Sequence, residues 1–149
     1  MLKVPVLYVA APVGAGSISE VCANVSRAQI WLSWLIDNEP GHAFAMPWLG
    51  YVNVLDDQNP EHRARGLRDS CSMAALCDGL VLVGGRISGG MQAEIDAVML
   101  AGGVVYDLTG IGQMPPSWPL PAGRRRVDVL GQECRTPLAY GRDAWLARR

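Results

Sequence analysis

The sequence predicts a single α/β domain in which helices cover both faces of a doubly wound parallel sheet. Three observations support this fold class. Short apolar runs alternate with segments of helical periodicity in the order β-α-β-α-β-α-β. The apolar runs contain many β-branched residues, which is typical of strands buried on both faces. The length of 149 residues suits one domain with its own core and is short for two ordinary domains.

The first half of the chain supplies two strands and one long helix. The apolar run at residues 4–10 predicts the first strand, and a glycine-containing loop follows it. Apolar residues at helical spacing predict a helix over residues 18–38, with Ser17 or Ser19 available to cap its first turn. The short apolar run AFAMPWL predicts a second strand at residues 43–49.

The next segments repeat the alternation. A loop that bears Tyr51 leads to a weaker helical period at residues 61–77. The run at residues 80–85 predicts a third buried strand, and the helix that carries Glu94 follows it. A fourth strand is expected at residues 103–109, after a pair of glycines that ends this helix.

The last part of the chain has a weaker pattern. Residues 111–124 contain four prolines, so we expect an irregular excursion or a partner-contacting arm within the domain of residues 1–149. Residues 125–130 could form a fifth strand, and residues 137–149 a last short helix. A parallel sheet of about five strands with helices on both faces is a flavodoxin-like fold.

The composition excludes several classes of function. Charged residues make up 18% of the chain and the net charge is −1, so neither polymeric nucleic acid nor an acidic membrane surface is an expected partner. The N-terminal apolar run is far shorter than the roughly 20 residues that span a bilayer. The four cysteines and two histidines show no zinc-site spacing, so we expect no metal, and isolated cysteines favour a reducing cytoplasm.

The loop G-A-G-S at residues 14–17 invites comparison with dinucleotide-binding loops, since it joins a strand to a helix. It lacks the third glycine, and the second strand does not end in an acid that would bind a ribose. We expect no bound cofactor. The loop is better suited to close backbone approach to a sugar or a phosphate.

One acidic residue has an unusual setting. On a helical wheel Met91, Ile95 and Val98 belong to the apolar stripe, and Glu94 lies on its flank, away from the water-facing edge. An acid near a helix N-terminus often only complements the helix dipole, and this structural interpretation stays open. A capping box does not explain it, because Ser88 precedes Glu94 by six positions and not by three.

Five motifs occur in order along the chain: L-Y-V-A-A-P at 7–12, R-D at 68–69, C-D at 77–78, S-G-G-M-Q-A-E at 88–94 and G-G-V-V-Y at 102–106. Together they resemble the nucleoside 2-deoxyribosyltransferase family and the related deoxynucleoside-monophosphate and hydroxymethyl-CMP N-glycosidases. The resemblance covers roughly 100 residues. It implies an enzyme that cleaves the N-glycosidic bond of a nucleoside or nucleotide and passes the sugar to a free nucleobase or to water.

The resemblance also implies roles for particular residues. Glu94 would be the nucleophile that attacks C1′ of the sugar and holds it covalently. Asp69 would protonate or hydrogen-bond the departing base, and the Tyr8 hydroxyl would orient the nucleophile. A plain core aromatic remains the alternative for Tyr8. The residues expected to bind the substrate are Ala10, Gly14, Ser88, Gly89, Gly90 and Trp48.

Several alternatives stay open. The transferases often carry an acid at the position of Ser88, and this departure favours a 5′-monophosphate hydrolase. A non-catalytic nucleotide-binding module would keep the same pocket without turnover. The chain has five tryptophans, which bring more large apolar area than a chain of this size readily buries. We therefore expect a homodimer or higher homo-oligomer. A homo-oligomeric structural protein is the third possibility. Trp48 could pack in the core instead of stacking on a base.

Overall fold

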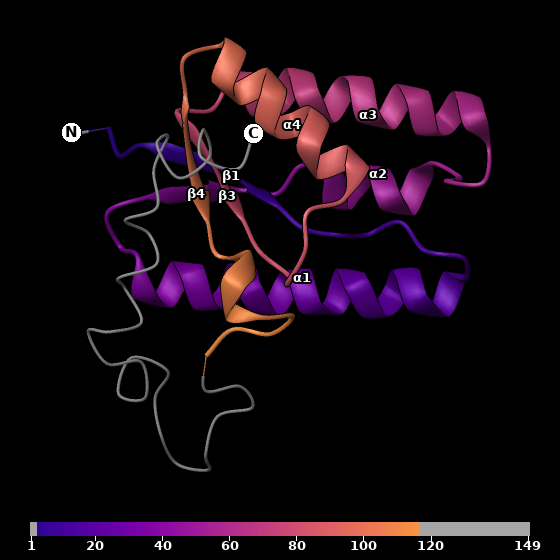
Figure 1. Cartoon of the computed structure of the whole chain (residues 1–149), viewed down its shortest axis with the longest axis horizontal. Coiled ribbons are helices and arrows are strands. Elements are labelled where there is room, and N and C mark those ends of the chain that lie inside the picture. The colour runs from indigo at the N-terminus through magenta and orange to yellow at the C-terminus, as the bar shows by residue number, and fades with distance from the viewer. Residues whose placement is uncertain (1–2, 117–149) are drawn as a thin grey trace.

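A computed structural model describes residues 3–116, and it shows an α/β domain with a parallel sheet (Figure 1). In this part of the chain the elements follow the order β1 (Val6–Ala10), α1 (Ile18–Asn38), β2 (Ala43–Ala45), α2 (Trp48–Val54), α3 (Pro60–Ala75), β3 (Gly79–Leu82), α4 (Gly89–Leu100), β4 (Val104–Asp107) and the 3-10 turn η1 (Thr109–Ile111). The predicted fold class is confirmed. The fifth strand at 125–130 and the helix at 137–149 lie outside the described residues, as does most of the proline-rich stretch 111–124.

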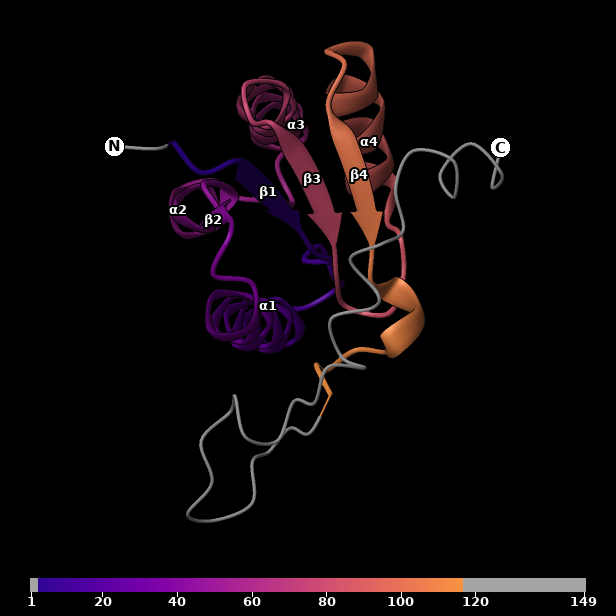
Figure 2. The same ribbon diagram turned by 90° about the vertical axis from the view of Figure 1, so that its left-hand side faces the viewer.

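The sheet has the strand order β2-β1-β3-β4, with every pair parallel. Side chains of a strand point alternately to its two faces. Leu7 and Val9 therefore pack against Trp31 and Leu35 of α1, whereas Tyr8 joins the cluster formed with α3 and α4. Figure 2 shows the resulting layers, with α1 on one side of the sheet and α3 and α4 on the other.

After β1 the chain adds β2 at one edge of the sheet, and after β3 it adds β4 at the opposite edge. The order in which strands are added therefore reverses between β1 and β3. In open α/β sheets ligands bind outside the carboxyl ends of the strands at such a switch point. The loops that leave β1 and β3 are in close contact there. Gly84 has a φ of 98°, and a Cβ on it would lie 2.6 Å from Cδ of Pro12. Only glycine fits this approach without strain.

Helix α1 begins and ends where the periodicity predicts. The Ser17 hydroxyl accepts a hydrogen bond from the Glu20 N–H, so Ser17 is the N-cap. Trp31 and Trp34 meet edge to face with ring centroids 5.6 Å apart. Trp31, Trp34 and Trp48 are all buried within the chain, so none of these three supplies the exposed apolar area on which the oligomer expectation rested. Trp118 and Trp145 lie outside the described residues.

The predicted second strand at residues 43–49 is wrong beyond Ala45. The strand has only three residues, and α2 begins at Trp48, so Tyr51 belongs to a helix and not to a loop. Pro47 explains the change, since it has no N–H for the sheet and adopts helical angles with φ −70° and ψ −22°. Trp48 consequently belongs to the first turn of a helix.

Helices α3 and α4 lie side by side over one face of the sheet (Figure 1). Asn59 caps α3 by accepting from the N–H groups of Glu61 and His62, and Ser88 caps α4 by accepting from the Met91 N–H. At the opposite end of the sheet the Val6 N–H donates to Asp78 Oδ2 at 2.7 Å. Asp78 therefore fastens the turn into β3.

None of the helices found between residues 3 and 116 is both long and apolar enough to cross a membrane. Over the same residues no group of three or more histidine, cysteine, aspartate and glutamate side chains is placed to hold a metal ion.

Candidate active site

Glu94 is the one buried acidic residue among residues 3–116. It lies in the second turn of α4, and only 7% of its surface is exposed. Its helical neighbours Met91, Ile95 and Val98 are buried in the core, so the carboxyl group points toward the sheet. The expectation that Glu94 faces away from water is confirmed. An acid that only complemented the helix dipole would not need this burial.

The Tyr8 hydroxyl donates a hydrogen bond to Glu94 Oε1 at 2.8 Å. Tyr8 lies in the middle of β1 and has no exposed surface. The bond joins two residues 86 positions apart in the sequence, because α4 packs directly on the face of the sheet to which Tyr8 points. Tyr8 is therefore more than a core aromatic, since its oxygen makes a specific contact with the buried acid.

The charge state of Glu94 is set by opposing effects. Burial raises the pKa of Glu94 from 4.5 to about 7, although hydrogen bonds from Tyr8 and Ser70 oppose this rise. Burial, and next the charge of Glu94, raise the pKa of Tyr8 far above its ordinary value. Tyr8 thus remains a hydrogen-bond donor at any physiological pH. Glu94 therefore gains and loses its proton near neutral pH, as is common for catalytic carboxyl groups.

Ser70 is a member of this cluster that the sequence analysis missed. It lies on α3 and is 6% exposed, and its hydroxyl donates to the Leu67 carbonyl at 3.1 Å. It is close enough to Glu94 and Tyr8 to lower the pKa of both. In residues 3–116 the buried polar or charged residues are Asn38, Ser70 and Glu94, so two of the three are neighbours. The signal available in the sequence was a serine directly after the R-D motif, in the interior of a helix where serine has no preference to occur.

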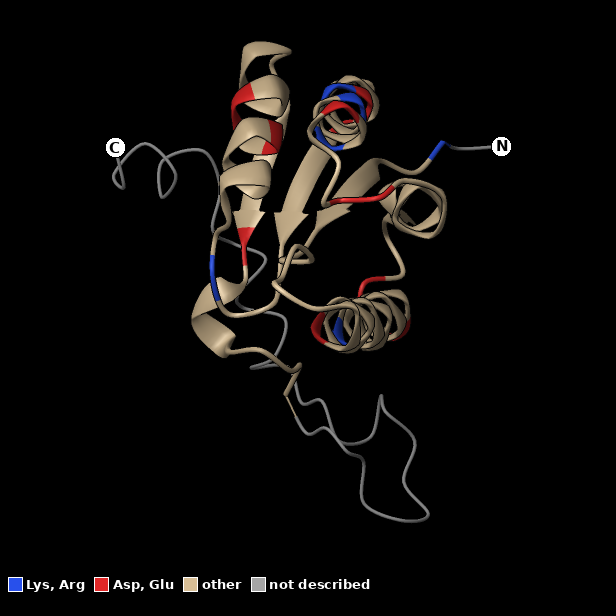
Figure 3. Cartoon of the chain, turned by 90° about the vertical axis from the view of Figure 1, so that its right-hand side faces the viewer, with Lys and Arg blue, Asp and Glu red and all other residues tan. Residues whose placement is uncertain are grey.

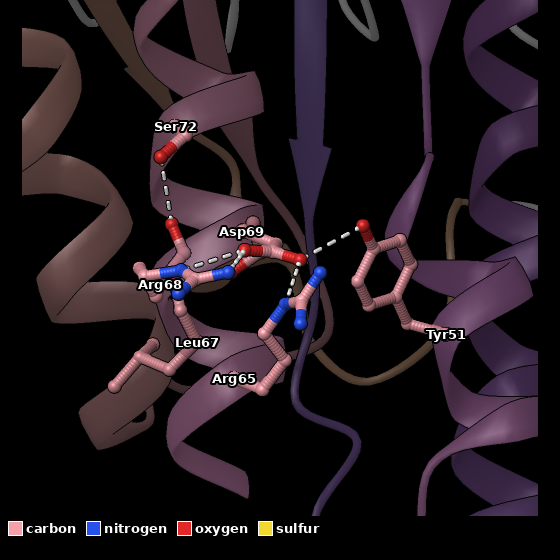
Figure 4. Close-up of polar contacts among 7 residues, drawn as sticks. Tyr51, Arg65, Leu67, Arg68, Asp69 and Ser72 are labelled. Atoms are coloured by element: carbon pink, nitrogen blue, oxygen red, sulfur yellow. Dashed lines mark hydrogen bonds and ion pairs between the residues drawn. The ribbon is translucent and has the colours of Figure 1, made fainter. Parts of the chain in front are cut away.

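Asp69 lies next to Ser70 but takes part in a different cluster, drawn in Figure 4. Its Oδ2 accepts from Arg65 Nε at 2.7 Å and from the Tyr51 hydroxyl at 3.1 Å. Its Oδ1 accepts from Arg68 at 2.9 Å from Nε and 2.8 Å from Nη2. Each carboxylate oxygen therefore has two donors. The arginine side chains are 60% and 65% exposed, whereas that of Asp69 is 16% exposed.

These contacts define what Asp69 can do. Hydrogen bonds from Arg65, and then from Arg68, hold the pKa of Asp69 at about 2. The carboxylate is ionised at neutral pH and has no proton to give to a departing base. A hydrogen bond to the base would require one present donor to leave, and Tyr51 forms the longest of these bonds and is uncharged. Figure 3 shows that α3 carries basic and acidic positions close together.

Two of the residues expected to bind the substrate lie in the core. Ala10 is completely buried at the end of β1, and its carbonyl accepts from the Val83 N–H at 3.0 Å. Trp48 is 7% exposed, and its Nε1–H donates to the Val9 carbonyl at 2.8 Å. Both residues thus support the carboxyl end of β1 from inside. For Trp48 the packing alternative describes its surroundings better than stacking on a base.

The other expected binding residues lie on loops or at a helix end. Gly14 is exposed in the loop after β1, and a Cβ on it would lie 3.3 Å from Asp57 Oδ2. Ser88 caps α4, and Gly89 and Gly90 form its first turn. Open space surrounds the Cβ position of Gly89. Glu94 follows Ser88 by six positions, which corresponds to a rise of about 9 Å along the helix. The structure therefore places this turn on the same helix as the buried acid.

Comparison with known families matches residues 5–105 to the family described as "Domain of unknown function (DUF7768)". This range covers about two thirds of the chain. The chain belongs to the DUF7768 family. The match begins just before β1 and ends within β4, so Tyr8, Ser70 and Glu94 all belong to the DUF7768 domain. No curated protein matches the chain.

Because the description of the DUF7768 family names no reaction, the chemistry has to be inferred from the site itself. The site consists of a buried carboxyl group that accepts a hydrogen bond from the Tyr8 hydroxyl and has the Ser70 side chain nearby. Asp69 precedes Ser70 on α3 and is ionised within its own cluster of Tyr51, Arg65 and Arg68. The three polar groups of the site come from β1, α3 and α4 and meet on the α3–α4 face of the sheet.

Proposed function

We propose that this DUF7768 protein cleaves the N-glycosidic bond of a nucleoside or nucleotide through a covalent glycosyl-Glu94 intermediate, and passes the sugar to a free nucleobase or to water. The observation that carries this proposal is the buried Glu94 carboxyl group with one oxygen held by Tyr8. A carboxylate nucleophile must be aimed and shielded from water, and a fixed hydroxyl donor supplies the aim.

In the first step an oxygen of Glu94 attacks C1′ of the sugar. The C1′–N bond breaks, and its electron pair leaves with the base. Tyr8 holds Oε1, so the attack falls to Oε2, and Oε1 becomes the carbonyl oxygen of the ester. Asp69 stays ionised and has no proton to give. The departing base therefore takes a proton from water, or it is already protonated before the C1′–N bond breaks.

In the second step a nucleobase nitrogen or a water oxygen attacks C1′ from the opposite side. The ester C–O bond breaks, Glu94 leaves as a carboxylate, and the attacking group loses a proton to solvent. Two displacements retain the configuration at C1′. Transfer and hydrolysis share the first step and differ only in the acceptor.

A 5′-monophosphate hydrolase is the second candidate, and the first turn of α4 favours it. Ser88 caps this turn and Gly89 faces open space, so backbone N–H groups at a helix N-terminus are available to an anion. The sugar would then extend from this turn toward Glu94, one to two turns further along the helix.

The test is a panel of deoxyribonucleosides, ribonucleosides and their 5′-monophosphates, incubated with and without free adenine and followed by chromatography. New nucleosides would indicate a transferase, and free base alone a hydrolase. Glu94→Gln keeps the size and removes the nucleophile, so base release should fall at least about 10³-fold. Asp96→Asn on the same helix is the matched control and should retain activity, since Asp96 is exposed.

Mass spectrometry of the quenched reaction should detect a sugar adduct on the peptide that contains Glu94. A non-catalytic nucleotide-binding module would give a different result. It would bind a nucleotide in calorimetry with equal affinity in the wild type and in Glu94→Gln, and neither protein would release base.

A further inference from the structure

Ser70 is a buried polar side chain at the site to which the proposed reaction assigns no task. Its hydroxyl donates to the Leu67 carbonyl of its own helix at 3.1 Å. The same buried side chain lies near Glu94 and Tyr8, since it lowers the pKa of both. A serine hydroxyl has a single proton. The proton can therefore serve the Leu67 carbonyl or the Glu94 carboxylate, but not both at once.

The charge on Glu94 decides between these two acceptors. A hydrogen bond to a carboxylate is about twice as strong as one to a neutral carbonyl. When Glu94 is ionised, the hydroxyl should turn to it. When Glu94 is protonated or esterified, the charge is gone, and the bond to the Leu67 carbonyl again becomes the better one. The change would need only a small rotation of the Ser70 side chain, with no movement of the backbone.

We propose that Ser70 is a positioning residue whose hydroxyl moves between the Leu67 carbonyl and the Glu94 carboxylate as the charge on Glu94 appears and disappears. The catalytic part of this inference rests on the proposed function. Ser70 would support Glu94 as an anion before attack, release it when the ester forms, and stabilise the carboxylate again as it leaves the sugar. Tyr8 has a different role in this proposal, because its hydroxyl would keep its bond to Oε1 throughout.

The groups that face Glu94 come from two elements. Tyr8 projects from β1, and Ser70 and Cys71 lie on α3. Burial, and next the charge of Glu94, raise the pKa of the Cys71 thiol, so Cys71 stays neutral at pH 7. Tyr8 also stays neutral. A titration near pH 7 that is sensed at the Glu94 side chain therefore reports Glu94 itself.

The experiment is an NMR titration of the full chain labelled with ¹³C at the glutamate carboxyl carbons, with Glu94→Gln used to assign the signal. Ser70→Ala should raise the pKa of Glu94 by about one pH unit. Ser70→Thr, which keeps a hydroxyl, should restore a value close to wild type. Ser72→Ala is the matched control, because Ser72 makes the same type of bond to the Arg68 carbonyl but is exposed. It should leave Glu94 unchanged.

An unchanged titration of Glu94 in Ser70→Ala, with a native thermal unfolding curve, would overturn the inference. Kinetics give a second, separate reading. In an active enzyme, Ser70→Ala should lower kcat/KM about tenfold below pH 6 and much less above pH 8. A shifted titration in a protein that never releases base would refute the proposed function and leave the role of Ser70 in setting the charge of Glu94 intact.

Discussion

Burying the Glu94 carboxyl group affects the folded state differently at different pH values. Its pKa is 4.5 in an unfolded chain and about 7 in the fold. Below pH 4.5 the group is protonated in both states, so burial carries no penalty for charge. As the pH rises through 7, the unfolded chain holds the charge more easily than the fold does, and stability is lost.

Glu94→Gln should therefore stabilise the protein at alkaline pH. The amide has no charge to bury, and the gain over wild type should grow by about 2 to 3 kcal/mol between pH 5 and pH 8. Urea unfolding at the two pH values measures this difference. Asp96→Asn on the exposed side of α4 should show no comparable dependence on pH, and an equal response of both variants would contradict the burial argument.

The sequence led to Glu94 and Tyr8 but not to the residues around them. Glu94 was identifiable because it lies on the flank of an apolar stripe, away from the water-facing edge, in a motif that follows a buried strand. The signal for Ser70, a serine that follows the R-D motif inside a helix, is weaker, since a helical serine is equally compatible with an exposed position. The contacts between Asp69, Arg65 and Tyr51 depend on how α2 approaches α3, and no spacing in the sequence encodes that distance.

Among the helices, those with clear periodicity were predicted and the shortest α-helix was not. Helix α1 spans 21 residues with a clear apolar face, and its bounds agree with the prediction. Helix α2 has only seven residues and contains Gly50, so it shows no helical periodicity. Its first apolar residues instead extend the strand predicted at 43–49. Pro47 was the available clue, because proline starts helices more readily than it continues strands.

Helix α3 depends on its cap. The Asn59 side chain satisfies the N–H groups of Glu61 and His62, which have no partner within the helix. Asn59→Ala should lower the free energy of unfolding by about 1 kcal/mol, and Asn59→Asp should keep most of it, because aspartate offers the same acceptor. Urea denaturation compares the three proteins. Equal losses in both variants would show that the cap is not the cause.

At the scale of the whole molecule, the close contact between the loops after β1 and β3 constrains the carboxyl edge of the sheet. Gly84 combines a φ of 98° with a Cβ position 2.6 Å from Pro12 Cδ, whereas Gly102 has a φ of 84° and nothing near its Cβ position. Gly102→Ala thus carries only the backbone penalty of about 1 kcal/mol. Gly84→Ala adds a clash with a rigid ring, and should destabilise by about 1 to 3 kcal/mol more.

Thermal unfolding of the two alanine variants measures this difference. Similar melting temperatures for Gly84→Ala and Gly102→Ala would mean that the two loops move apart at little cost. A much lower melting temperature for Gly84→Ala would mean that the carboxyl edge of the sheet is rigid. A rigid edge is what a site at the switch point requires, because the reacting groups must be held within a fraction of an ångström.

The layered architecture was the most predictable feature of the molecule. Alternating buried strands and helices permit few arrangements, since parallel strands need a crossover helix and these crossovers are right-handed. The strand order β2-β1-β3-β4 fits the doubly wound sheet. What brings Tyr8, Ser70 and Glu94 together is the packing of α3 and α4 on one face, which follows from side-chain shape and not from the order of elements.

The buried acid of α4 has a consequence for laboratory evolution. A library of variants screened for survival of heat in mildly alkaline buffer, with no other requirement, should replace glutamate at position 94 within the first rounds of enrichment. A neutral side chain of similar shape is the replacement to expect. If a second screen for turnover of a chosen substrate restored glutamate, the pair of outcomes would separate what the residue does for the organism from what it does for the fold.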